Sequence, residues 1–374
     1  MGIASTIVLA ISACSGGGGQ SAPQLTIPIA TELRPTPDGF SFPNFPASAT
    51  PIGFGDADLF AMFGAEACVD GVSTPCVATA EAAAWARMVN QARQAGHCEG
   101  FAVLAASRFE KKETPENALL QNEGDVTHGL MRAFATQFLP EVQQETGKWQ
   151  QTAPSELIKQ LKDGLASQKV PFSMGLYSDA GGHAVLPYAL KYLDGDVVRV
   201  MVYDSNWPGA DRYVDVNVKA ETWEFSYSGK DPVTDTAKWA GGLGSIDLTS
   251  MDSRVNAKCP FCGNNSGIAK TILVLRSATG DWSVNTPGGV ISPGAPDIAT
   301  GSTRPLKRAE GDSAPMDYVI VLDSGSPATF TLPSATKVVG VTPNAALEFS
   351  SPESKGSTNV EVVVGDTGIS SNDP

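Results

Sequence analysis

A cysteine, a histidine and a carboxylate occur in this chain in the order that a thiol hydrolase requires. Cys98 lies in the run GHCEGFA (96–102), His183 opens the run HAV (183–185), and Asp204 opens the run DSNW (204–207). In such enzymes the thiolate attacks a carbonyl carbon and the imidazole moves the proton. A third polar group holds the imidazole in the required tautomer. These residue types predict an enzyme that acts by nucleophilic acyl transfer.

Cys98 follows a glycine and precedes apolar residues at helical spacing, so we expect it in the first turn of a helix. The peptide dipoles at a helix start and a nearby imidazolium lower the pKa of a cysteine from about 8.5 to ~3.5–7.5. The alternative is a buried structural cysteine, because free cysteines are among the most buried residues.

The chain has three histidines, and we expect His183 to be the base. His97 adjoins Cys98, and consecutive residues of a helix do not face each other, so the sequence predicts a turn residue there. His128 lies in a helical stretch and is predicted to be a surface or core histidine.

The orienting group is expected on the strand that follows His183. A two-residue turn at Asp194 and Gly195 would place Asn206 directly opposite His183 and Asp204 diagonally opposite, on the same face. We favour Asp204, with Asn206 as the alternative. A three-residue loop would invert the face, and Pro187 indicates an edge or a bulge that could do so.

The beginning of the chain resembles a bacterial lipoprotein signal. The apolar residues 1–13 end in an aliphatic residue and two small ones before Cys14, which would carry the lipid, although the usual early Lys or Arg is missing. Residues 15–50, rich in Gly, Ser, Thr and Pro, are predicted to be a flexible linker. We therefore expect a secreted protein that is anchored at the cell envelope and contacts the membrane only through Cys14.

The other five cysteines suggest two local pairs and one free thiol. Cys68 with Cys76 and Cys259 with Cys262 are close in sequence, which would leave Cys98 unpaired. The C-x-x-C motif also fits a redox pair or half of a zinc site. It has no surrounding β-α-β pattern and no second motif to complete a metal shell, so we favour disulfides.

The remaining pattern predicts an α+β fold with a second, β-rich region. Helices are expected at 80–94, 126–146 and 154–167, and strands at 170–177, 183–192 and 197–203. Short apolar runs at 271–275, 318–322 and 360–364 suggest a β-sandwich. The expected boundaries are a signal peptide at 1–14, a linker at 15–50, an enzyme domain at 51–258 and a β-rich domain at 259–374. The last five residues form no recognisable closing element, which suggests that the chain stops short.

The cysteine on a helical first half and the histidine and aspartate on strands of a second half resemble the papain-like cysteine peptidase superfamily. The resemblance covers about residues 50–258 and implies Cys98 as nucleophile, His183 as base and Asp204 as orienting residue. The superfamily's oxyanion glutamine lies six residues before the cysteine, where this chain has Ala92, and Gln91 and Gln94 are the nearby candidate donors. The helix-then-strand order also resembles transglutaminase-like domains.

The resulting expectation is a monomeric, lipid-anchored peptidase or amidase that uses no cofactor and acts on a peptide or other amide. The net charge of −14 would repel a phosphate backbone, so nucleic acid is not an expected partner. Two alternatives stay open. One is a transglutaminase-like acyl transferase, and the other is a non-catalytic binding lipoprotein on the same scaffold.

Overall fold

The computed structural model describes residues 29–255, 258–262, 269–306, 316–353, 360–365 and 368–371. The predicted signal peptide, Cys14 and residues 15–28 of the predicted linker lie outside this part. None of the helices in the described ranges has the length and apolar character needed to cross a bilayer.

Residues 29–50 pack against the rest of the protein. Strand β1 (Ile29–Ala30) pairs with β5, and the short helix α1 (Pro35–Asp38) follows it. Leu33, Phe40 and Phe45 are buried in one core cluster with residues of the helices and the sheet. The prediction of a flexible linker is therefore wrong for residues 29–50, because their large apolar side chains gain more from burial than a tether composition suggests.

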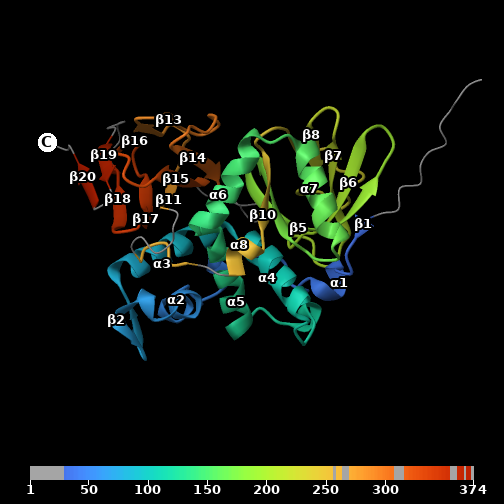
Figure 1. Ribbon diagram of the computed structural model, residues 1–374, viewed down its shortest axis with the longest axis horizontal. Helices are drawn as coiled ribbons and strands as arrows, with labels where there is room; N and C mark the ends of the chain where they lie inside the picture. The colour runs from blue at the N-terminus through green and yellow to red at the C-terminus, as the bar shows by residue number, and fades with distance from the viewer. Residues whose placement is uncertain are drawn as a thin grey trace, which may run out of the picture.

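The helices form a layer beside a curled antiparallel sheet (Figure 1). They are α2 (Asp56–Phe63), α3 (Ala80–Ala92), α4 (Cys98–Lys111), α5 (Gly124–Ala135), α6 (Pro140–Lys148), α7 (Pro154–Ala166) and α8 (Asp252–Val255). The single helix expected at 126–146 is divided into α5 and α6. Leu139 is extended because the residue before a proline avoids helical geometry, and Pro140 then begins α6.

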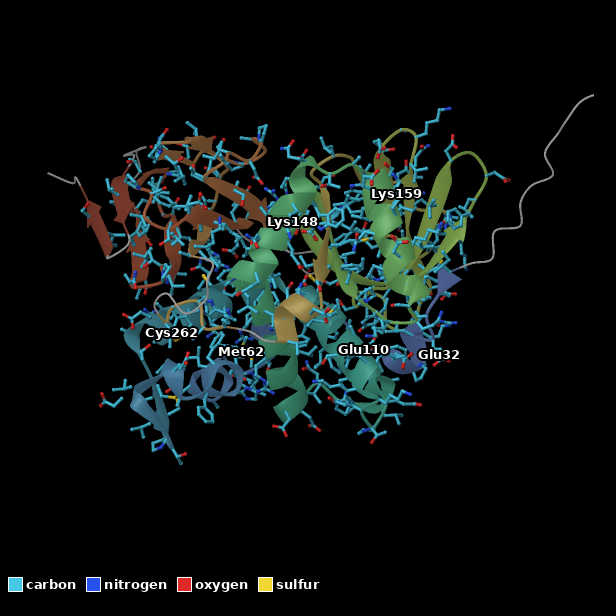
Figure 2. All side chains as sticks on the ribbon, viewed as in Figure 1. Glu32, Met62, Glu110, Lys148, Lys159 and Cys262 are labelled. Atoms are coloured by element: carbon cyan, nitrogen blue, oxygen red, sulfur yellow. A yellow bond between two sulfur atoms is a disulfide. The ribbon has the colours of Figure 1, made fainter. Side chains whose placement is uncertain are left out.

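The larger sheet has the strand order β10-β4-β5-β6-β7-β8-β9, with β1 added at β5. Its strands are β4 (Phe172–Ser178), β5 (Gly181–Tyr192), β6 (Val197–Tyr203), β7 (Arg212–Asn217), β8 (Thr222–Phe225), β9 (Trp239–Gly241) and β10 (Ile246–Ser250). Leucines of α7 pack on valines of β6 and β7 in a continuous core. Side chains fill the space between the layers, while charged residues such as Glu110 and Lys159 lie at the surface (Figure 2).

The hairpin of β5 and β6 differs from the expected one at its turn. Tyr192 pairs with Val198, so the loop has three residues, 194–196, and not two. Farther along, the register shifts by one residue between Pro187 and Ala189. The bulge compensates for the longer loop, and Leu186 pairs with Tyr203 in the register that the two-residue turn predicts.

The C-terminal region is a β-sandwich of two five-stranded sheets. One contains β11 (Lys270–Ser277), β14 (Gly301–Pro305), β15 (Met316–Asp323), β17 (Lys337–Val341) and β18 (Ala346–Ser350). The other contains β12 (Ser283–Thr286), β13 (Gly289–Ile291), β16 (Ala328–Leu332), β19 (Val360–Gly365) and β20 (Gly368–Ser371). The first sheet packs on α3, and residues of α2, α3, α5, β11 and β17 share one apolar core.

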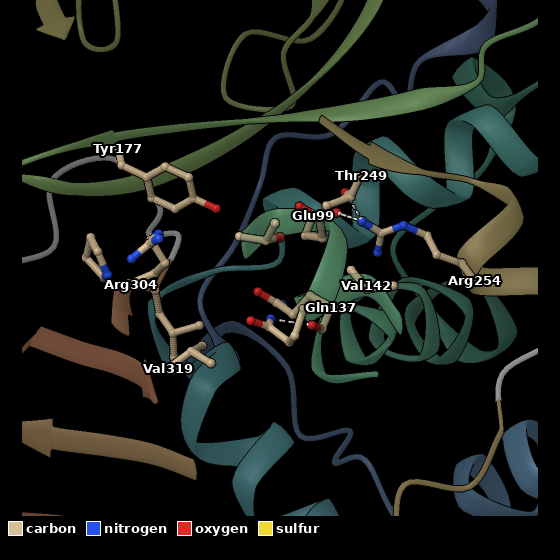
Figure 3. A pocket seen from close by; sticks show the side chains of 12 residues that line it. Glu99, Gln137, Val142, Tyr177, Thr249, Arg254, Arg304 and Val319 are labelled. Carbon is tan, nitrogen blue, oxygen red and sulfur yellow. Dashed lines mark hydrogen bonds and ion pairs between the residues drawn. The ribbon is translucent and has the colours of Figure 1, made fainter. Parts of the chain in front are cut away.

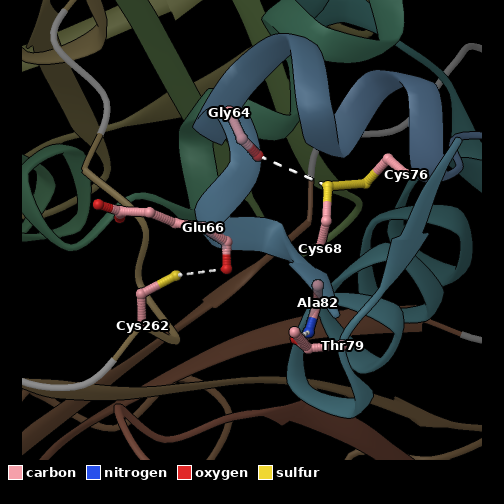
Figure 4. Close-up of a disulfide and its surroundings, with 7 residues drawn as sticks. All are labelled: Gly64, Glu66, Cys68, Cys76, Thr79, Ala82 and Cys262. Atoms are coloured by element: carbon pink, nitrogen blue, oxygen red, sulfur yellow. Dashed lines mark hydrogen bonds between the residues drawn. A yellow bond between two sulfur atoms is a disulfide. The ribbon is translucent and has the colours of Figure 1, made fainter. Parts of the chain in front are cut away.

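Both predicted disulfides are present, and Cys98 is the free cysteine among the described residues. The pair Cys68–Cys76 joins strands β2 (Cys68–Ser73) and β3 (Cys76–Ala78), as Figure 4 shows. Cys262 of the second pair lies near this hairpin, with its sulfur 3.6 Å from the carbonyl oxygen of Glu66.

Candidate active site

Cys98 is the first residue of α4, as the sequence predicts. Gly96, with φ of 140°, makes the turn into the helix, and His97 is the residue that precedes the first turn. The helix lies very close to α5, because a Cβ atom on Gly100 would lie 2.3 Å from the carbonyl oxygen of Leu130. The glycine therefore lets the start of α4 be buried deeply, and the thiol with it.

His183 lies on β5, paired with Leu176 of β4. Its ring stacks on Phe225 at a centroid distance of 6.0 Å and meets the ring of Tyr227 edge-on at 5.2 Å. Tyr227 in turn stacks on Trp239 at 4.2 Å. Three aromatic rings from β8 and the residues after it thus fix the plane of the imidazole.

Asp204 follows the end of β6 and binds the imidazole directly. Its Oδ1 is 2.8 Å from Nε2 of His183 and accepts a second hydrogen bond from the backbone N–H of Asn206, at 2.9 Å. Nε of Arg212 lies 3.8 Å from the other carboxylate oxygen, Asp204 Oδ2, so the two side chains form an ion pair. The structure brings the carboxylate of Asp204 to His183, while Asn206 approaches Asp204 through its backbone.

The surroundings favour a protonated imidazole. Burial alone would lower the pKa of His183, but the Asp204 carboxylate, with a smaller contribution from the Cys98 thiol, raises it to about 10. Nδ1, the nitrogen not bonded to Asp204, makes no hydrogen bond of regular geometry. The effect of Cys98 on this pKa shows that its side chain lies near the ring, so Nδ1 is the ring nitrogen available to exchange a proton with the thiol.

The three side chains are fully enclosed, since Cys98, His183 and Asp204 each have 0% of their surface exposed. The carbonyl oxygen of Leu306, in the C-terminal region, accepts a 3.4 Å hydrogen bond from Gly182, next to His183. A groove of about 640 Å³ between α4, α5 and α8 contains none of the three. A substrate can reach the sulfur only after part of this cover moves.

A buried polar cluster surrounds Glu99, the residue that follows Cys98 in sequence (Figure 3). The Glu99 carboxylate accepts from Arg254 at 2.5 Å and from the hydroxyl of Ser173 at 2.8 Å, and Arg254 also contacts Thr249. The cavity at this cluster measures about 20 Å³, room for about one water molecule. It is a structural feature rather than a substrate pocket.

Other residues singled out from the sequence lie outside the triad. The amide of Gln91 donates to the carbonyl oxygen of Val274 in β11 at 3.3 Å, so it is committed to the C-terminal sheet and does not serve as the oxyanion donor. His97 is buried, and its Nδ1 is 2.7 Å from the carbonyl oxygen of Phe45. His128 pairs with the carboxylate of Asp58 at 3.0 Å.

Three polar residues of this region were missed in the sequence. Asn44 forms hydrogen bonds with His97 and Asn206. Arg212 forms an ion pair with Asp204, and Arg254 forms one with Glu99. Asn44 lies in the run FSFPNFP (40–46), whose three phenylalanines were the available signal that this segment is packed. Arg212 and Arg254 carry no comparable signal, because only the fold brings them to their partners.

Comparisons with family models, with curated proteins and with solved structures found no match for this chain. In the described ranges, no group of three or more His, Cys, Asp or Glu side chains is arranged to hold a metal ion. The function is therefore inferred from the geometry of the site.

Proposed function

We propose that this protein is a thiol-dependent hydrolase, a peptidase or amidase of papain-like type held at the cell envelope by a lipid on Cys14. The observation that carries the proposal is the arrangement of Cys98, His183 and Asp204. A free cysteine begins a helix, its thiol lies near one side of His183, and the other ring nitrogen of His183 binds Asp204. Nucleophile, base and orienting group thus occur in the order that acyl transfer needs.

The raised pKa of His183 supports an acid role in the first half of the reaction. The thiol proton of Cys98 passes to His183 as Sγ forms a bond to the carbonyl carbon, and the C–N bond then breaks as the leaving amine takes that proton from His183. This step leaves a thioester on Cys98. In the second half, water adds to the thioester while His183 takes its proton, the C–S bond breaks, and the carboxylic acid leaves.

The oxyanion of the tetrahedral intermediate requires hydrogen-bond donors. The first N–H groups of a helix have no acceptor within the helix, which makes the backbone N–H of Cys98 the candidate donor on this chain. The positive end of the α4 dipole also stabilises the negative charge of the oxyanion.

The enclosure of the triad favours transfer of the acyl group to an amine as a second candidate. A thioester formed in a site without exposed surface meets little bulk water, and an amine that enters with the acyl donor competes for it. Hydrolysis and transfer share the first half-reaction and differ only in the second acceptor.

The test is to trap the acyl enzyme. The protein is mixed with a library of peptides and peptide amides, quenched in acid, and digested, and mass spectrometry locates a thioester. We expect an acyl adduct on Cys98 in the wild type. In His183→Gln the adduct should either persist longer or fail to form. In Cys98→Ala no adduct should form. His128→Gln, a histidine outside the site, is the matched control and should behave as the wild type.

Addition of a primary amine then separates the two candidates. An amide product that grows with amine concentration at the expense of free acid would support transfer, and an unchanged yield of acid would support hydrolysis. The absence of any adduct on Cys98 together with no turnover would contradict both and favour the non-catalytic binding protein.

A further inference from the structure

Residues 39–45 lie between the helix that carries Cys98 and the strand that leads to Asp204. The backbone N–H of Phe40 donates to the Tyr203 hydroxyl at 3.2 Å, and the ring of Phe45 lies 4.5 Å from the ring of His97. There is no space for a side chain at Gly39, where a Cβ atom would lie 2.5 Å from the Tyr203 ring. The segment therefore contacts both halves of the site.

Asn44 makes the polar contacts of this segment. Its Oδ1 accepts from the backbone N–H of His97 at 2.7 Å, and its Nδ2 donates to Oδ1 of Asn206 at 3.2 Å. Its backbone N–H donates to the carbonyl oxygen of Ser205 at 2.8 Å. One side-chain amide thus joins the residue before the nucleophile to the residues after the orienting aspartate.

These hydrogen bonds form a chain from the residue before Cys98 to Asp204 and His183. Asn206, which Asn44 holds by its side chain, donates its backbone N–H to the same Asp204 oxygen that binds His183. The position of Asp204 relative to Cys98 therefore depends on a direct tie and not only on packing of the two layers.

We propose that Asn44 is a positioning residue of the active site, which sets the placement of the Cys98 helix against the loop that holds Asp204. The inference rests on the proposed function. It assigns a role to a residue of the N-terminal segment, which the papain-like core of helices and strands does not itself provide. A misplacement of about 1 Å between reacting groups costs on the order of 100-fold in rate, so a tie of this kind has a measurable effect on catalysis.

This chain of hydrogen bonds predicts that Asn44 affects Asp204 through Asn206. In Asn44→Ala, the loop with Asp204 loses the side-chain amide that joins it to the Cys98 helix, while the backbone bond from residue 44 to Ser205 remains. The contacts that raise the pKa of His183 should then weaken. Because Asn206→Ala removes the same link from the other side, the double variant should resemble either single variant instead of showing their sum.

Nitrogen NMR of protein with labelled histidine measures this directly, because the chain has only three histidines. We expect the pKa of His183 in Asn44→Ala to fall by about one unit or more toward the ordinary value of ~6.5. The pH profile of Cys98 alkylation by iodoacetamide should shift in the same variant toward that of a free thiol. Turnover of any peptide found in the acyl-enzyme assay should fall by about 10–100-fold.

Asn117→Ala is the matched control. Asn117 is buried, while Asn44 is partly buried, and Asn117 donates to the carbonyl oxygen of Asp38, just before residues 39–45, without contacting the triad. Both alanine variants should lower the melting temperature, and only Asn44→Ala should move the His183 pKa. Should Asn44→Ala fail to fold, Asn44→Asp keeps the acceptor for the His97 N–H and loses the donor to Asn206, and it takes the place of the alanine variant.

Two outcomes separate this inference from the proposed function. If Cys98→Ala changes the His183 pKa while Asn44→Ala and Asn44→Asp leave it as in the wild type, Asn44 is not a positioning residue and the proposed triad stands. If Cys98→Ala leaves the His183 pKa unchanged, thiol and imidazole are not coupled, and both proposals are wrong.

Discussion

Arg254 donates from Nη2 to the carboxylate of Glu99 at 2.5 Å, and both side chains are almost completely buried. Glu99 directly follows Cys98, so a negative charge lies within one residue of the thiol. Arg254 comes from the short helix α8, far away in the sequence. The ion pair therefore balances a charge that would otherwise oppose the formation of a thiolate at the start of α4.

Removal of Arg254 should be costly. Arg254→Met leaves the Glu99 carboxylate buried without its cation, and breaking a buried pair in this way costs about 3–5 kcal/mol of unfolding free energy. The double variant with Glu99→Gln should recover much of the loss. Urea denaturation measures both. Arg87→Met, which breaks the exposed pair with Glu348, is the control and should cost less than about 1 kcal/mol.

The pKa of His183 predicts how stability depends on pH above neutrality. Between the ordinary value of ~6.5 and the folded value of about 10, the native protein holds a proton that the unfolded chain has released. The unfolding free energy should therefore fall as pH rises through this window, by up to about 1.4 kcal/mol per pH unit from this group. The difference between wild type and His183→Gln, measured by denaturation at several pH values, should show this slope, and a flat difference would contradict it.

His97 should act in the opposite sense below neutrality. Burial lowers its pKa to about 4, the hydrogen bond to Phe45 opposes that shift, and Arg93 adds to it. Between ~6.5 and about 4 the unfolded chain takes up a proton that the native protein does not, so stability falls as pH decreases through this window. In His97→Gln this part of the acid sensitivity should disappear, which a comparison of its denaturation midpoints with those of the wild type at each pH will reveal.

Gly100 should not tolerate a methyl group. Alanine favours helices, but the added Cβ would lie 2.3 Å from the backbone oxygen of Leu130, and overpacking of this kind costs about 1–3 kcal/mol. Gly100→Ala should lower the melting temperature and push the start of α4 away from α5. Gly147→Ala in α6, where nothing lies within 4 Å of the added atom, is the control and should stabilise the protein slightly. Equal effects at the two positions would contradict the close approach of α4 to α5.

Much of the secondary structure could be predicted because local signals were strong. The Thr79 hydroxyl oxygen caps α3 by accepting a hydrogen bond from the backbone N–H of Ala82, and the β-branched runs at β6, β11 and β15 are strands as expected. The packing of residues 29–50 against the rest of the protein could not be predicted from their composition. Their prolines and serines resemble a tether, and their burial depends on surfaces of α4 and β6 that only the folded protein provides.

The residues of the candidate site could be predicted from the sequence, but their arrangement in space could not. The loop at 194–196 is one residue longer than expected, which would turn His183 to the opposite face, and the irregularity near Pro187 reverses that change. Each deviation was foreseeable as a possibility, and their cancellation was not. The arginines that face Asp204 and Glu99 come from β7 and α8, and no sequence spacing relates these elements to the triad.

The apolar core shared by α3 and the C-terminal sheet has a consequence for biosynthesis. Trp85 and Val89 belong to the same cluster as Val274 and Val339, which leave the ribosome long afterwards. Contacts between residues so distant in sequence slow folding, since the chain between them must be made and closed first. The nascent helical half therefore emerges with one apolar face uncovered, and this face stays exposed until β17 is synthesised.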